Sequence, residues 1–302
     1  MSEVIEKGAL FELELGLPND KIAASTKRLV GFEARYQRLH RDLRLLADPQ
    51  ELADWSKKFH HKELAICAAV SDRYPLVIFA GDVGTGKTAT AEGACDRLAR
   101  EARKEAMLFK LSTRVRGSGK VGQMSSLLNE AFDVVAKQAG KTRQAFLIID
   151  EADSLAATRD TIQSHHEDKV AVNTIIQKVD DLRRHLGRIL VFLCTNRVGA
   201  LDPAIVRRAA RTEEFARPSE QEREELFRMD LEGLSIKDET IHELVRLTGA
   251  RDGQPGFTFS VLRSKLLPDA LCRAFPSRAL TGDDLIDAAK GVRPSPVVRN
   301  GS

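Results

Sequence analysis

The sequence predicts an α/β fold in which a mainly parallel sheet is followed by a smaller, all-helical domain. Up to about residue 217, short β-rich apolar runs alternate with segments of helical length. This alternation is typical of parallel strands joined by right-handed helical crossovers. Beyond Pro218, helical segments continue without convincing strands. The sheet is therefore expected in the first two thirds of the chain.

The elements are expected in a regular order along the chain. An amphipathic pattern at 27–48 predicts a helix, and an apolar helical stretch at 63–70 leads into the first strand. Each expected strand is a continuous apolar run, as suits a strand that is buried on both faces. Strands are expected at 76–80, 107–111, 146–150 and 189–196, with helices at about 87–103, 124–138 and 170–186. The helical domain is expected to begin at a cap on Ser219 followed by an acidic first turn.

These patterns divide the chain into four regions. Residues 1–50 are expected to form an N-terminal helical segment, and 51–217 the large α/β domain. Residues 218–292 are expected to form the small helical domain. The end, 293–302, is rich in Pro, Gly and Ser and has few apolar residues, so we expect a flexible tail.

Composition excludes several classes of protein. Of the 302 residues, 42% are hydrophobic and 30% are charged, which is ordinary for a soluble globular protein. The longest purely apolar stretch, 64–70, is too short to cross a membrane, and residues 1–10 do not resemble a signal peptide. A cytoplasmic protein with no membrane partner is expected. The net charge of +3 is too small a bias to predict nucleic-acid binding.

One motif directly after the first apolar strand predicts nucleotide binding. It matches the pattern G-x-x-x-x-G-K-[ST] between a strand and a helix, in the residues Gly81, Asp82, Val83, Gly84, Thr85, Gly86, Lys87 and Thr88. The glycines let backbone N–H groups converge on phosphate oxygens at the start of the helix. Lys87 is expected to reach the β and γ phosphates of ATP or ADP, and the Thr88 hydroxyl is expected to ligate Mg²⁺. A glycine-rich turn without a ligand is the plain alternative.

Two adjacent carboxylates, Asp150 and Glu151, end the strand at 146–150. Carboxylates are costly at the end of a buried strand unless they engage a cation or a reacting water. Asp150 is expected to orient Mg²⁺ through its water shell, while Glu151 is expected to polarise the water that attacks the γ-phosphate. An acidic pair at a strand end is, by itself, more often the solvated start of a loop. The phosphate-binding motif earlier in the chain favours a catalytic role for this pair.

Asn196 ends the next apolar strand. In a parallel sheet its amide would emerge at the same edge as Gly81 and Asp150, where it could position the attacking water. A turn-forming asparagine is the alternative interpretation.

Together with the segment LDPAIVRRAAR at 201–211, these motifs resemble the AAA+ superfamily over about 55–280. The resemblance implies an AAA+ parallel-sheet nucleotide-binding domain with a smaller all-helical lid domain, with ATP between them. It also implies a homo-hexameric ring in which a neighbour supplies an arginine finger to the phosphate. Arg207 and Arg208 lie where such proteins carry that finger.

Three further stretches, GSGKV at 117–121, IDEADSLAATR at 149–159 and VNTIIQKVD at 172–180, resemble the pachytene checkpoint family. Members of that family remodel HORMA-domain proteins, and the bacterial ones act in antiphage signalling (CBASS). The resemblance implies that Arg114, Val115 and Arg116 form a substrate-gripping pore loop, although aromatic residues are absent there. It also implies a lid arginine that senses nucleotide; Ser260 stands at that position and Arg263 is the nearest arginine.

The sequence thus predicts an ATPase that opens HORMA-domain proteins and disassembles their complexes, including one with a nucleotidyltransferase. A DNA-associated AAA+ ATPase of the clamp-loader or transposition-helper type is the alternative, because Arg114, Arg116 and Lys120 could line a phosphate-tracking pore. A scaffold that uses nucleotide only to assemble is a third possibility, which the presence of Glu151 disfavours.

Overall fold

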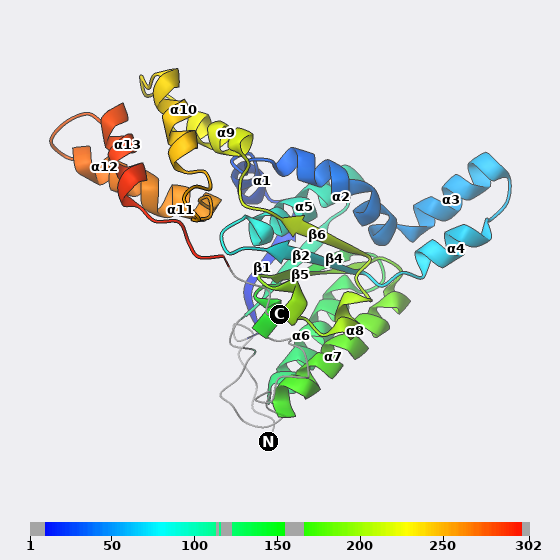
Figure 1. The fold of residues 1–302 in the computed structure, drawn as a ribbon. Coiled ribbons are helices and arrows are strands. Elements are labelled where there is room, and N and C mark those ends of the chain that lie inside the picture. The colour runs from blue at the N-terminus through cyan, green and yellow to red at the C-terminus, as the bar shows by residue number, and fades with distance from the viewer. Residues whose placement is uncertain (1–9, 113–114, 116–122, 155–165, 298–302) are drawn as a thin grey trace.

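The computed structural model describes residues 10–112, 115, 123–154 and 166–297. At its centre is a six-stranded sheet in the order β1-β3-β4-β5-β2-β6, in which β1 runs antiparallel to β3 and the other pairs are parallel (Figure 1). The strands are β1 (Phe11–Leu17), β2 (Leu76–Gly81), β3 (Ala106–Leu111), β4 (Gln144–Ile149), β5 (Ile189–Thr195) and β6 (Arg211–Phe215). The predicted α/β class is confirmed.

The four inner strands are the ones that the sequence predicts. Every residue of β4 and β5 is buried, and so are the first five of β2. The two edge strands, β1 and β6, were not predicted. In β1, FELELGL, charged residues alternate with apolar ones because one face of an edge strand meets water, whereas β6, RTEEF, has a single apolar residue and buries the charged Glu213.

Helices cover both faces of the sheet and enclose two apolar cores. One face is covered by α2 (Phe32–Ala47) and α5 (Lys87–Ala102), and the other by α6 (Gln123–Ala139) and α7 (His166–Leu182) (Figure 1). This arrangement explains the continuous apolar runs of the inner strands, since both of their faces are dry.

Residues 1–50 are not the purely helical segment that the sequence predicts. Besides β1, the described part contains α1 (Asp20–Thr26) and α2, and the buried face of α2 packs into the same core as α5 through residues such as Tyr36, Leu39 and Leu43. These residues therefore belong to the packing of the α/β domain. After them, α3 (Pro49–His60) and α4 (Ala65–Ser71) project from one side of the molecule (Figure 1).

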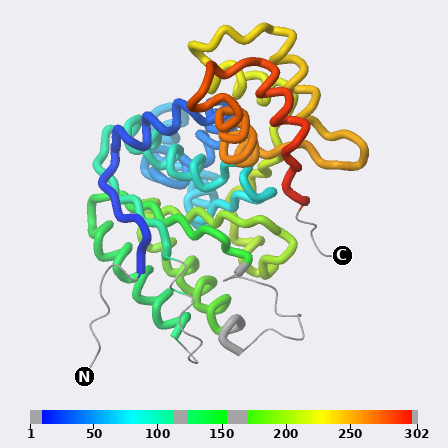
Figure 2. Tube along the Cα trace, turned by 90° about the vertical axis from the view of Figure 1, so that its left-hand side faces the viewer, coloured from blue at the N-terminus to red at the C-terminus, as the bar shows by residue number. Residues whose placement is uncertain are grey.

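The C-terminal helices form a separate lobe with its own apolar core (Figures 1 and 2). Its first helix has the expected cap: the Ser219 hydroxyl accepts from the Glu222 N–H, and the Glu222 carboxylate accepts from the Ser219 N–H. The lobe contains α9 (Glu220–Asp230), α10 (Asp238–Leu247), α11 (Phe259–Val261), α12 (Leu267–Ala274) and α13 (Gly282–Gly291), with a π-helical turn at Leu262–Leu266. We call this lobe the lid.

Short helices complete the fold. They are the 3₁₀ turns Ala152–Ser154, Arg183–His185 and Val198–Ala200, and α8 (Pro203–Val206). Within the described ranges, no helix is both long and apolar enough to traverse a lipid bilayer.

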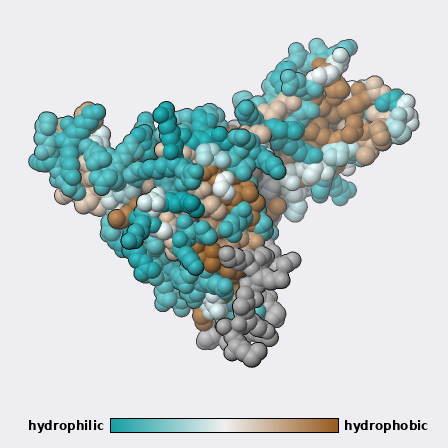
Figure 3. Space-filling view, turned by 180° about the vertical axis from the view of Figure 1, so that it is seen from behind, coloured by the Kyte–Doolittle hydropathy of each residue, from teal (hydrophilic) through white to brown (hydrophobic). Residues whose placement is uncertain are grey.

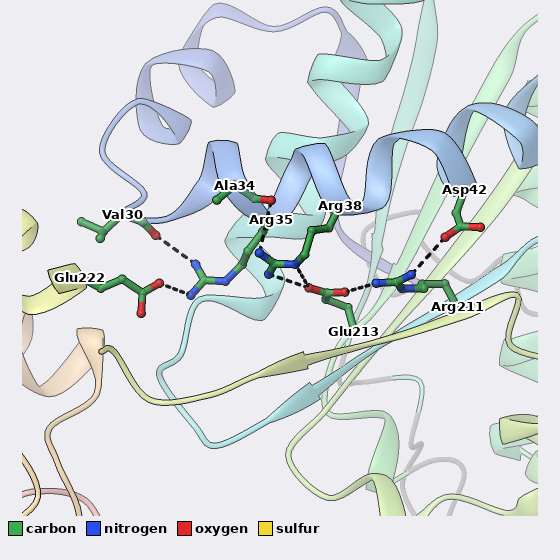
Figure 4. Close-up of polar contacts among 8 residues, drawn as sticks. All are labelled: Val30, Ala34, Arg35, Arg38, Asp42, Arg211, Glu213 and Glu222. Atoms are coloured by element: carbon green, nitrogen blue, oxygen red, sulfur yellow. Dashed lines mark hydrogen bonds and ion pairs between the residues drawn. The ribbon is translucent and has the colours of Figure 1, made fainter. Parts of the chain in front are cut away.

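A chain of ion pairs joins α2 to the lid and to β6 (Figure 4). Arg35, 8% exposed, donates to the Glu222 carboxylate at 2.7 Å and to the Val30 carbonyl at 3.0 Å. Farther along α2, Arg38 donates to Glu213 at 2.8 Å. The guanidinium of Arg35 also lies 5.4 Å from the ring centroid of Phe215. Arg35 is therefore the central link between the two domains on this side.

We expect Arg35→Met to lower the free energy of unfolding by about 2–4 kcal/mol, because it removes one partner of a largely buried ion pair and leaves Glu222 and the Val30 carbonyl without this donor. Chemical denaturation would measure the change. The matched control is Arg246→Met, whose solvent-exposed pair with Glu243 should contribute little to stability. Equal effects of the two substitutions would contradict the role given to Arg35.

Candidate active site

The phosphate-binding motif forms the turn between β2 and α5. Gly84 and Gly86 have φ of 78° and 91°, in the left-handed region that favours glycine. A Cβ on Gly81 would lie 2.1 Å from the Phe215 carbonyl oxygen, so β6 also requires a glycine there. The Thr85 hydroxyl donates to the Asp82 carbonyl at 2.8 Å and closes the turn. The loop thus has a fixed curvature, and α5 starts directly after it at Lys87.

The side chain of Lys87 lies inside this turn. Its Nζ donates to the carbonyl oxygens of Gly81 and Asp82 at 2.8 and 2.9 Å, and to Asn196 Oδ1 at 2.9 Å. Burial lowers the pKa of Lys87, because a dry environment disfavours the charged ammonium. Lys87 and Asn196, 109 residues apart, therefore meet at the carboxyl edge of the sheet.

Thr88 and Asp150 meet at the same edge. The Thr88 hydroxyl donates to Asp150 Oδ2 at 2.7 Å. A hydroxyl and a carboxylate oxygen are hard donors of the kind that Mg²⁺ prefers, and that ion needs few protein ligands when phosphates supply others. This pair therefore fits a magnesium ion. The Lys110 ammonium, a residue that the sequence did not single out, lies 3.8 Å from Asp150 Oδ2.

Glu151 follows β4 in an unusual backbone conformation. Its φ is 50°, which is rare for a residue other than glycine, and its N–H donates to Asp150 Oδ1 at 2.9 Å. The residue is exposed, unlike the strand before it. Strained backbone of this kind is frequent at functional sites, where the surroundings hold the residue in place.

Asp153 holds two strand ends together and was missed by the sequence analysis as a site residue. Its Oδ1 accepts from the Thr195 hydroxyl at 3.0 Å and from the Asn196 N–H at 3.2 Å. The carboxylate thus fixes the turn on which Asn196 sits. The only available signal was its position three residues after Asp150, which does not by itself indicate a partner on another strand.

Comparison with known proteins agrees with this geometry. The model of the ATPase family associated with various cellular activities (AAA) matches residues 77–217. CD-NTase-associated protein 6 of Escherichia coli strain KTE188 is 52% identical over 97% of this chain and 99% of its own length. The chain belongs to the AAA family, in its CD-NTase-associated protein 6 group. It is therefore a nucleotide-binding ATPase.

Two solved structures resemble this AAA chain over nearly its full length. A chain of the E. coli MS115-1 HORMA:CdnC:Trip13 complex is 38% identical, with a TM-score of 0.91 and coverage of 98% of this chain and 99% of that one. The structure of Rhizobiales Trip13 is 31% identical, with a TM-score of 0.73 and coverage of 95% and 100%.

The two arginines expected as a finger of the AAA site differ in their surroundings. Arg208 is held by Asp180 through Nε and Nη2 at 2.5 and 2.8 Å, and lies over the Tyr74 ring. Arg207 is exposed and makes no ion pair with any residue in the described ranges. Arg207 is therefore free to reach a second molecule, whereas Arg208 is engaged within its own chain.

Arg263 is not placed as the lid sensor that the resemblance implies. Its guanidinium donates to both carboxylate oxygens of Asp230, at 2.5 and 3.0 Å, and to the Arg28 carbonyl at 2.8 Å. These contacts join the lid to the N-terminal region, and they engage Arg263 away from the phosphate loop. The lid instead contacts the phosphate loop through Ser260, whose N–H donates to the Gly84 carbonyl at 3.1 Å.

The expected pore loop is described only at Val115. This side chain is 0% exposed and lies in the core beside α6, so the expectation that Val115 grips a substrate is wrong. Arg114 and Arg116 lie outside the described residues. The apolar character of Val115 is explained by burial.

We expect Lys87→Ala to weaken ATP binding by about 100-fold, because the ammonium is the only side-chain cation found inside the described turn and a buried charge contact with phosphate contributes several kcal/mol. Titration with a fluorescent ATP analogue would measure this. Lys104→Ala, at a half-exposed lysine paired with Asp48, is the matched control. Unchanged affinity of the Lys87 variant would contradict the assignment of the loop.

Proposed function

We propose that this AAA ATPase is a protein remodeller that opens or unfolds HORMA-domain proteins and disassembles their complexes, and that it thereby limits a bacterial cyclic-nucleotide antiphage system. The observation that carries the proposal is the similarity, over 98% of the chain, to a chain of a HORMA:CdnC:Trip13 complex. The second relative, a Trip13 structure, supports the same group.

The strand-end residues divide the chemistry of hydrolysis. Lys87 would bind the β and γ phosphates, and Thr88 directly and Asp150 through water would hold a magnesium ion, which would supply charge stabilisation when bound. Glu151 accepts a proton from the attacking water, and Asn196, fixed by Asp153 and in contact with Lys87, orients that water. The contacts of Lys87 with Asn196 and of Thr88 with Asp150, at one edge of the sheet, support these roles.

A homo-hexamer is part of the proposal. Exposed apolar side chains lie on the projecting helices α3 and α4 (Trp55, Phe59 and Ile66) and on the lid (Leu271 and Phe275), at opposite ends of the molecule. Seen from behind, apolar surface is visible over the lid and over part of the large domain, between hydrophilic areas (Figure 3). Two different surfaces at opposite ends suit head-to-tail contacts, which form a ring when the rotation between neighbouring subunits closes. In such a ring Arg207 is the residue that reaches a neighbour's phosphate.

The test is disassembly of a purified complex between a cognate HORMA-domain protein and its nucleotidyltransferase. With this chain and ATP, size-exclusion chromatography should show separated proteins within minutes. With a non-hydrolysable ATP analogue the complex should persist. A complex that survives active ATP turnover by this chain would contradict the proposal, and DNA-stimulated turnover in its place would support the alternative of a DNA-associated ATPase.

A further inference from the structure

Arg217 joins three segments that are far apart in the sequence. It lies between β6 and α9, where the large domain connects to the lid, and its side chain is 12% exposed. Its Nε donates to Asp82 Oδ2 at 2.7 Å. Its Nη1 donates to the carbonyls of Gly256 and Ser295 at 2.6 and 2.9 Å, and its Nη2 donates to the Pro296 carbonyl at 3.0 Å. One guanidinium therefore contacts the phosphate loop, the lid and the C-terminal segment.

Asp82 places a carboxylate in the loop that has to receive phosphate. It follows Gly81 directly, its side chain is 15% exposed, and its own carbonyl accepts from the Lys87 ammonium at 2.9 Å. A carboxylate at this position repels the negatively charged triphosphate. The repulsion is stronger where water is partly excluded, because the effective dielectric constant is lower there. A cation that pairs with Asp82 reduces this repulsion.

We propose that Arg217 is a positioning residue of the nucleotide site, which neutralises Asp82 so that the phosphate loop can accept a triphosphate, and that the C-terminal segment at 293–297 holds its guanidinium in place. The planar guanidinium of arginine suits this arrangement, because Nε donates to the carboxylate while the two terminal nitrogens donate to three carbonyls. A lysine ammonium cannot reach all four acceptors from one position.

Part of the C-terminal segment that was expected to be a flexible tail contacts Arg217. From α13, the C-terminal segment runs back toward the large domain (Figures 1 and 2). Ser295 and Pro296 supply two of the four acceptors of Arg217. The side chain of Arg217 thus ties the C-terminal segment to the nucleotide site.

The inference rests on nucleotide binding by the phosphate loop, and it is tested by ATP and ADP affinities of four proteins: wild type, Arg217→Ala, Asp82→Asn and the double variant. Titrations with fluorescent nucleotide, with magnesium and with EDTA, need no turnover. Arg217→Ala should weaken ATP binding about 10- to 100-fold, and ADP binding less, because the triphosphate carries more charge. Asp82→Asn should bind ATP at least as well as wild type, and the double variant should recover most of the lost affinity.

The rescue separates a charge effect from a loss of structure. A double variant that binds as weakly as Arg217→Ala would overturn the proposal, and so would Asp82→Asn binding ATP tenfold more weakly than wild type. If Arg217→Ala does not fold, the Asp82→Asn result alone decides. Failure of the wild type to bind nucleotide would instead contradict the proposed function itself.

A shortened chain ending at Arg293 tests the role of the C-terminal segment. It lacks the Ser295 and Pro296 carbonyls but keeps Asp82 and Gly256 as acceptors. We expect the KM for ATP to rise about threefold to tenfold with little change in kcat, because the truncation removes two of the four acceptors that hold Arg217. An unchanged KM would refute this part of the proposal.

Discussion

Replacing Glu151 with glutamine is expected to lower kcat for ATP hydrolysis by about 10²- to 10⁴-fold, because the amide cannot accept the proton of the attacking water. The substitution keeps the size of the side chain, and Asp150, Thr88 and Lys87 keep their contacts. ATP affinity should therefore stay near that of wild type. Phosphate release and nucleotide titration would measure the two quantities separately.

The control for this variant is Glu105→Gln, the same change at an exposed residue before β3. Its turnover should equal that of wild type. If the remodelling proposal holds, the Glu151 variant should also retain a HORMA-domain protein in the presence of ATP, which pull-down would detect. Normal turnover by Glu151→Gln would exclude Glu151 as the base.

Replacing Arg207 with alanine is expected to lower kcat about 10³-fold, the effect of removing an arginine that stabilises charge on the transferred phosphate. Binding of ATP should change little, since Arg207 contacts no residue of the phosphate loop within the described structure. Arg208→Ala is the informative comparison: it breaks the contacts with Asp180 and should chiefly lower the melting temperature.

Mixing subunits tests whether Arg207 acts on a neighbour. Subunits with Arg207→Ala keep a complete nucleotide site, whereas Lys87→Ala subunits keep the arginine but lose ATP. Neither should turn over ATP alone, and a mixture should recover activity. No recovery, in mixtures shown to exchange subunits, would contradict an action across the subunit boundary.

The inner strands and the central residues of the site could be predicted from the sequence. Both depend on local apolar patterns and on the rule that parallel strands end at the same edge of a sheet. Continuous apolar runs identify β2, β4 and β5, and parallel strands bring their carboxyl ends to one edge. The contacts of Lys87 with Asn196 and of Thr88 with Asp150 have this origin. The edge strands β1 and β6 were not predicted, because several positions in each strand face solvent and carry charged residues, so neither strand is a continuous apolar run.

The residues that sequence reasoning misplaced depend on partners from distant segments. Arg263 pairs with Asp230, 33 residues away, and Val115 is buried against α6. Arg217 has its four acceptors in three segments that only the folded lid assembles. Such pairings are decided by the packing of whole elements, and no spacing in the sequence encodes them.

The attachment of Arg208 to Asp180 has a mechanical consequence. Asp180 lies near the carboxyl end of α7, a helix of 17 residues and thus about 25 Å long. A helix of this length resists compression along its axis, so a push on its first turn is transmitted to its last one. Arg207 is the immediate neighbour of the residue clamped there. A force applied to the first turn of α7 would therefore displace the Arg207 guanidinium relative to the neighbouring subunit. In a ring, the force on one subunit would in this way affect when its neighbour hydrolyses ATP.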